Sequence, residues 1–86
     1  GNRRRVMYKY VINPQVNKAL FYKQCERLEK KMSGIVKKRL LEDVDGALIQ
    51  IYEHPRGEID VYNDEQLDEL YLRSEFDLRP YGVLLK

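Results

Sequence analysis

The sequence contains very few of the residues on which catalysis and metal binding most often depend: one His, one Cys, two Ser and no Thr. Zinc sites typically use three or four His and Cys ligands, and this chain has one His and one Cys. A nucleophile and base pair of Cys25 and His54 would need both side chains in one pocket. The pattern instead predicts Cys25 on the apolar side of a helix and His54 in a turn. We therefore expect no enzymatic activity, no metal site and no cofactor.

Other absences exclude further classes of protein. The five glycines occur singly, so no glycine-rich loop is available to hold a phosphate. No apolar run approaches the roughly 20 residues that a membrane-spanning helix needs. The single cysteine cannot form an internal disulfide, which is typical of a reducing compartment and predicts a cytoplasmic location.

The length of 86 residues and the apolar content of 43% predict one domain with one small core. Residues 1–6 contain three consecutive arginines and no large apolar anchor apart from Val6, so we predict a basic tail there and a single domain over 7–86. An initial Gly1 is typical of the remnant of a protease cleavage, in which case Met7 would be the natural start.

The distribution of β-branched, aromatic and turn residues predicts most of the elements. We expect strands over 6–12, 35–41, 47–53 and 58–63. A helix is expected from Pro14 to about Met32, with Asn13 as its N-cap. The pair Asp45-Gly46 is a tight-turn signal between the second and third strands.

The last quarter of the sequence is open to two interpretations. Residues 63–74 begin like a capping box and have a short apolar stripe at helical spacing, which favours a second helix, although a strand competes over 69–74. A final strand is expected at 82–86. The predicted order is βαβββαβ, an α+β fold with an antiparallel-dominated sheet, either a ferredoxin-like variant or, if the second helix fails, one helix on a curled sheet.

The expected core follows from the inward positions of these elements. In the third strand we assign Ile49 and Ile51 to the inner face and Gln50 and Tyr52 to the outer face. In the fourth, the inner residues alternate with Glu58, Asp60 and Tyr62 on the outside. The predicted core residues are Phe21, Leu28, Ile49, Ile51, Ile59 and Val61.

Charge is divided sharply along the chain. Residues 1–39 hold 12 Lys and Arg but 2 Asp and Glu, whereas residues 40–86 hold 4 and 12, so the halves carry net charges of +10 and −8. Such asymmetry indicates what a protein binds more than how it folds. The predicted partner-binding residues are basic: Lys23, Arg27, Lys30, Lys31, Lys37 and Arg39. A second, acidic partner surface is predicted at Asp64, Glu65, Asp68 and Glu69.

Two functions fit this pattern. The first is a small protein-binding module of regulatory, inhibitor or immunity type, which docks through complementary charge. The alternative is nucleic-acid binding through the basic half, with bases stacked on the strand tyrosines Tyr8, Tyr10, Tyr52 and Tyr62. Carboxylates beside Tyr62 and the absence of an RNP-type signature weigh against the alternative. The identity of the partner and assembly into a homo-oligomer stay open.

Overall fold

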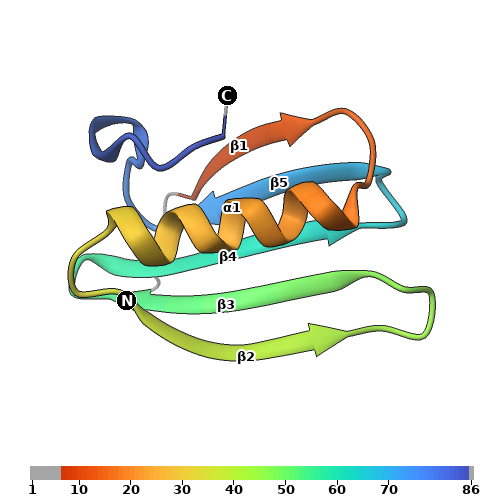
Figure 1. Cartoon of the computed structure of the whole chain (residues 1–86), viewed down its shortest axis with the longest axis horizontal. Coiled ribbons are helices and arrows are strands. Elements are labelled where there is room, and N and C mark those ends of the chain that lie inside the picture. Colours follow the sequence, from red (N-terminus) through yellow and green to blue (C-terminus); the bar gives the residue numbers. More distant parts are fainter. Residues whose placement is uncertain (1–6, 86) are drawn as a thin grey trace, which may run out of the picture.

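A computed structural model describes residues 7–85 as a five-stranded antiparallel sheet with one α-helix across one face (Figure 1). The predicted basic tail at 1–6 lies outside the described residues. The elements are, in chain order, β1 (Tyr8–Asn13), α1 (Lys18–Lys31), β2 (Val36–Glu42), β3 (Leu48–His54), β4 (Gly57–Asp64), β5 (Glu69–Ser74) and a short 3₁₀ helix, η1 (Arg79–Tyr81).

The strands lie in the order β1-β5-β4-β3-β2, so the first two strands of the chain form the two edges of the sheet. Helix α1 connects these edges and lies across the middle strands (Figure 1). Strands β2 to β5 follow one another as an antiparallel meander, and β1 adds to β5 in antiparallel fashion. The prediction of an α+β domain with an antiparallel sheet and a long helix is confirmed.

The second helix predicted over 63–74 is wrong, because this segment completes β4, turns, and forms β5. Strand β5 fills the position between β1 and β4, where Leu70 and Leu72 are completely buried and Tyr71 is nearly so. The strand predicted at 82–86 is also absent from the described part of that segment, which follows η1 as irregular backbone. The order βαβββαβ and the ferredoxin-like variant are therefore not confirmed.

The helix begins later than the sequence predicts, because Asn17 rather than Asn13 is its N-cap. The Asn17 side chain accepts a hydrogen bond from the Leu20 backbone N–H at 3.0 Å, which satisfies one of the free donors at the helix start. Its own backbone N–H donates to Asn63 Oδ1 at 2.9 Å and so ties the helix start to β4. Asn13 instead ends β1.

The core lies between α1 and the sheet. The predicted core positions Phe21, Leu28, Ile59 and Val61 are confirmed as completely buried. The inside and outside of β3 are reversed, however: Gln50 and Tyr52 face α1, while Ile49 and Ile51 are half-buried on the other face. The buried apolar cluster is completed by side chains from the helix, the strands and the C-terminal segment: Cys25, Met32, Leu48, Leu70, Leu72, Phe76, Leu78 and Val83.

Gln50 is accepted in the core because its side-chain amide has partners. Its Nε2 donates to the carbonyl oxygens of Lys38 and Arg39 at 2.9 and 3.2 Å, where β2 loses its regular register against β3. The irregularity exposes carbonyls that a regular ladder would use, and Gln50 satisfies them.

Within the described residues, no helix has the length and apolar character needed to cross a membrane.

Candidate functional site

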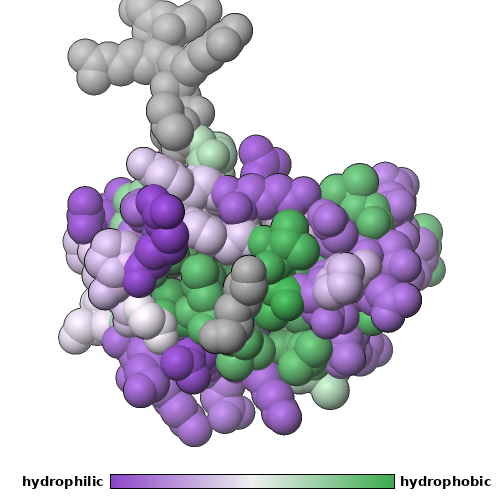
Figure 2. All heavy atoms as spheres, turned by 90° about the horizontal axis from the view of Figure 1, so that it is seen from above, coloured by the Kyte–Doolittle hydropathy of each residue, from purple (hydrophilic) through white to green (hydrophobic). Residues whose placement is uncertain are grey.

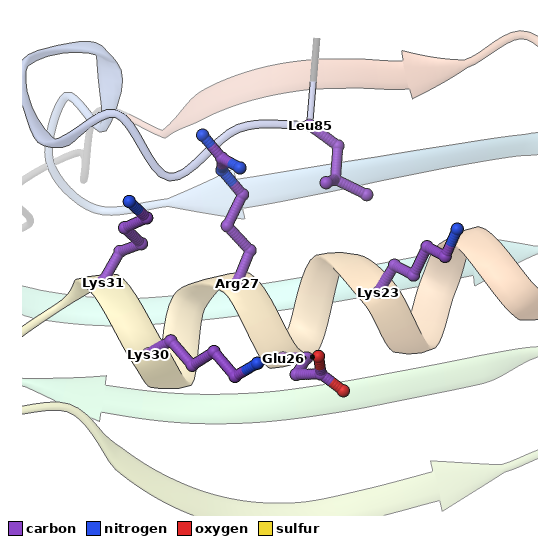
Figure 3. A pocket seen from close by; sticks show the side chains of 6 residues that line it. All are labelled: Lys23, Glu26, Arg27, Lys30, Lys31 and Leu85. Carbon is purple, nitrogen blue, oxygen red and sulfur yellow. Dashed lines mark hydrogen bonds and ion pairs between the residues drawn. The ribbon is translucent and has the colours of Figure 1, made fainter.

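Four of the predicted partner-binding residues come together on one flank of α1. Lys23, Arg27, Lys30 and Lys31 are spaced at i, i+4, i+7 and i+8, which places them on neighbouring rows of a helix. With Glu26 and Leu85 they line a hollow of about 290 Å³, here called the basic groove (Figure 3). The helix provides one wall of this groove, and the C-terminal segment provides the other.

The second wall is held in place by a buried glutamine on α1. Gln24 is completely buried, and its Nε2 donates to the Val83 carbonyl oxygen at 2.8 Å. Its Oε1 accepts a hydrogen bond from the Leu85 backbone N–H at 3.0 Å. One side chain therefore satisfies a backbone acceptor and a backbone donor two residues apart, in the manner of a neighbouring strand.

Arg27 reinforces this arrangement, because its Nε donates to the Gly82 carbonyl oxygen at 3.3 Å. Figure 3 shows Arg27 and Lys31 pointing from the helix toward the C-terminal segment.

Gln24 was not among the predicted site residues. Its position could have identified it, because Gln24 is a polar residue on the apolar arc of the helix. A buried amide almost always has specific hydrogen-bond partners.

The groove carries an excess of positive charge. Lys30 Nζ lies 3.2 Å from Glu26 Oε1, an i, i+4 pair whose side chains are 72% and 66% exposed and which contributes little to stability. Among the described residues, Lys23 and Lys31 form no ion pair. Four cationic side chains and one carboxylate therefore share the groove, a composition that suits an anionic ligand.

The other two predicted basic residues lie outside the groove. Lys37 belongs to the α1 side of β2, where its Nζ lies 3.6 Å from Glu29 Oε2. Arg39 lines a different hollow, of about 370 Å³, which it shares with Ile51 on the opposite face of the sheet. The six residues therefore do not form one continuous surface, although the four on α1 do.

Three of the four predicted acidic residues have structural contacts at the turn between β4 and β5. Asp64 Oδ1 accepts hydrogen bonds from the backbone N–H groups of the next turn, and its Oδ2 accepts one from the Tyr71 hydroxyl at 2.7 Å. Asp68, at φ 53°, accepts from the Val16 backbone N–H at 3.0 Å. Glu69 pairs with Lys9 at 3.0 Å.

These hydrogen bonds affect the pKa of Asp64. Burial acts to raise the pKa of Asp64, but the hydrogen bonds from Tyr71 and from the backbone of Leu67 and Gln66 outweigh it, so this pKa is lowered. Asp64 is therefore a charged turn residue that already accepts three hydrogen bonds. Within the predicted acidic surface, Glu65 is left as the most available carboxylate.

The cysteine and the histidine have separate surroundings. Burial raises the pKa of the Cys25 thiol to about 11, which keeps it protonated and poorly nucleophilic. His54 stacks on Phe76 with ring centroids 5.0 Å apart, and its Nδ1 accepts the Arg56 backbone N–H at 3.1 Å. Over residues 7–85, no three His, Cys, Asp or Glu side chains are grouped so that they could hold a metal ion.

Comparison with known proteins gives no match to a family model, to a curated protein or to a solved structure. The function must therefore be inferred from the surfaces of this chain.

Proposed function

We propose that the chain is a small, non-enzymatic binding module that docks an acidic segment of a protein partner in the basic groove. The observation that carries the proposal is the gathering of Lys23, Arg27, Lys30 and Lys31 around one hollow with Leu85 at its far wall. Cations at the rim attract and orient an acidic chain, and an apolar residue in the same hollow gives it a contact that excludes water. A regulatory, inhibitor or immunity-type role fits such a module.

The groove is a better site for a polypeptide than for a nucleic acid because three of the four strand tyrosines are engaged elsewhere, and Tyr8 stacks on Tyr10 on β1 with ring centroids 6.5 Å apart. Tyr52 is completely buried in the core, and the Tyr10 hydroxyl is occupied by Asp77 and the Leu78 backbone N–H at 2.8 and 2.9 Å. Tyr62 lies on the face of the sheet opposite α1, next to Asp60. Single-stranded nucleic acids bind where cations and stacking rings line the same path.

The experiment compares two double variants that change net charge equally. Lys23→Glu/Lys31→Glu reverses two groove cations with no described ion pair, whereas Lys18→Glu/Arg39→Glu reverses two exposed cations outside the groove that likewise form no ion pair among the described residues. Binding is measured by fluorescence anisotropy with a labelled peptide rich in Asp and Glu that contains two leucines, and with a 12-nucleotide single-stranded RNA.

We expect the groove variant to bind the peptide at least tenfold more weakly than the wild type, and the control variant to bind nearly as well as the wild type. An equal loss in both variants would show that only total charge matters and would contradict the proposal. Tight RNA binding that the peptide does not displace would favour the nucleic-acid alternative. Raising the salt concentration does not distinguish them, because both interactions weaken.

A further inference from the structure

The face of the sheet opposite α1, here called the open face, carries an apolar row that crosses all five strands. The cross-strand register places five side chains directly opposite one another, namely Val11, Tyr71, Tyr62, Ile49 and Leu41. The rings of Tyr62 and Tyr71 stack with centroids 4.7 Å apart, while Val11 and Leu41 at the ends are 38% and 42% exposed. The described helices and the C-terminal core residues pack on the other face.

The row reaches the β1 edge of the molecule at Val11, which also lines a hollow of about 510 Å³ with Leu84. Seen from this edge, apolar side chains gather at the middle of the surface, with charged residues around them (Figure 2). Val11 therefore joins the end of the row to a hollow at this edge that Lys9 and Arg79 also border, and exposed apolar surfaces commonly mark a site of interaction.

Asp60 lies beside the row at the middle of β4, the central strand. It is 8% exposed, and its Oδ1 has no hydrogen-bond partner within the described part of the chain. Arg73 is its register neighbour on β5, yet no ion pair within 4 Å joins the two described side chains. A buried carboxylate oxygen without a donor is unfavourable, and a donor supplied by a ligand would remove that cost.

Two more carboxylates extend this site along the same face. Glu58 precedes Asp60 by two residues on β4. Glu53 on β3 is the register neighbour of Glu58. Glu53 and Glu58 both border two hollows, of about 240 and 370 Å³. Lys38 and Arg39 also line the larger hollow, and Lys38 Nζ lies 3.8 Å from Glu53 Oε1. Glu58 is therefore the carboxylate beside Asp60 with no ion pair among the described residues. A buried acceptor, two further acids and stacked rings are thus adjacent on one face.

We propose that the open face docks an arginine-bearing segment of a partner polypeptide, with the guanidinium on Asp60 and Glu58 and the neighbouring apolar side chains along the row. A guanidinium has five N–H donors in one plane, so it can satisfy two carboxylates and stack on a tyrosine ring at once. The row already accepts a cation, because Lys9 Nζ lies 4.4 Å from the centroid of the Tyr71 ring.

The negative charge of Asp60 and Glu58 argues against two other ligands for this site, a second copy of the chain and a nucleic acid. A second copy docked about a two-fold axis through the centre of the sheet would bring its own Asp60 toward this one, because β4 is the middle strand. Phosphates of a nucleic acid would be repelled where they approach Asp60 and Glu58, although Arg39 and Arg73 lie nearby. This site goes beyond the proposed function, since it lies on the opposite face from the basic groove and selects a ligand of opposite charge.

The test is an NMR titration of the ¹⁵N-labelled full chain with the peptide acetyl-Leu-Arg-Leu-amide. The matched probe carries citrulline, which has nearly the shape of arginine without its charge. We expect the arginine peptide to shift the amides of Asp60, Tyr62 and Arg73, and the citrulline peptide to bind at least tenfold more weakly. Asp60→Asn and Glu58→Gln should each weaken binding several-fold, whereas Glu65→Gln should leave it unchanged.

The proposal would be overturned by equal binding of both peptides, by an equal loss in Glu65→Gln, or by shifts confined to α1. Concentration-dependent shifts on the open face without peptide would also overturn it, in favour of a second copy as the occupant. Two separate carboxylate variants keep the test valid if one of them perturbs folding, which thermal unfolding of each variant would reveal.

Discussion

The Tyr52 hydroxyl donates a hydrogen bond of 2.5 Å to Glu29 Oε2, which joins the buried middle of β3 to the side of α1. The same hydroxyl lies 3.4 Å from the Cys25 carbonyl oxygen. Glu29 also faces Lys37 of β2 at 3.6 Å. Burial first, and then the bond to Glu29, raises the pKa of Tyr52, so the hydroxyl remains a donor. One carboxylate therefore connects the helix to two adjacent strands.

Replacing Tyr52 by Phe should lower the free energy of unfolding by about 1–2 kcal/mol, because the ring still fills its site but Glu29 loses a donor. Urea unfolding of wild type and variant measures this difference. Tyr22→Phe is the matched control, since Tyr22 is 50% exposed and its change should be close to neutral. Equal effects of the two substitutions would show that the bond to Glu29 does not contribute.

The orientation of β3 shows where sequence patterns become ambiguous. Apolar or aromatic residues occupy both of its faces, so alternation alone could not choose between Ile51 and Tyr52 as the inward residue. The choice depends on Glu29 and on the carbonyls that Gln50 satisfies, which belong to other elements. In β4 the acids alternate strictly with Ile59 and Val61, and there the predicted inward residues are confirmed, although Asp60 on the other face is buried as well.

Because of this reversal, Ile51→Ala should cost only about 1 kcal/mol, while Ile59→Ala should cost about 2–5 kcal/mol as a core truncation. Ile51 is half-buried on the open face, and Ile59 is completely buried. Urea unfolding of both variants gives the comparison. If Ile51→Ala proves as costly as Ile59→Ala, the open face must be covered by another molecule under the conditions of measurement.

The basic groove was partly predictable for a physical reason. Helical spacing is local, so the clustering of Lys23, Arg27, Lys30 and Lys31 follows from the sequence once α1 is recognised. The second wall depends on Gln24 meeting Val83 and Leu85, contacts between residues about sixty positions apart. Local pattern carries no information about such pairs. The same limit applies to β5, whose apolar spacing fits a helix until its place between β1 and β4 is known.

Gln24→Leu should release the C-terminal segment from α1, since leucine keeps the volume but offers neither bond. We expect a loss of about 1–3 kcal/mol in stability, from the buried Val83 carbonyl and the part-buried Leu85 amide left without partners. Hydrogen exchange at the Leu85 amide should become faster, and binding of the acidic peptide in the basic groove should weaken. Gln66→Leu, at an exposed turn, is the control. Unchanged exchange at Leu85 would contradict the role assigned to Gln24.

The buried carboxyl on the open face predicts a specific dependence of stability on pH. Burial, followed by the hydrogen bond and the charge of Glu58, raises the pKa of Asp60 to about 7, although Arg73 acts in the opposite direction and Glu75 adds to the rise. The folded state therefore holds this proton more tightly than the unfolded chain does. The resulting stabilisation is complete below the unfolded pKa of 3.8 and is lost as the pH rises through about 7.

Asp60→Asn should consequently raise the free energy of unfolding at pH 8, by on the order of 1–2 kcal/mol, because asparagine carries no charge to bury and solvent at this face screens part of the effect. At pH 5 the folded Asp60 is mostly protonated and only part of its stabilisation has been lost, so the difference between variant and wild type should be clearly smaller than at pH 8. Urea unfolding at both pH values measures the change, with Glu65→Gln as a control on the exposed turn. A difference that is the same at pH 5 and pH 8 would mean that Asp60 is ionised in the folded protein throughout this range, and would contradict the raised pKa.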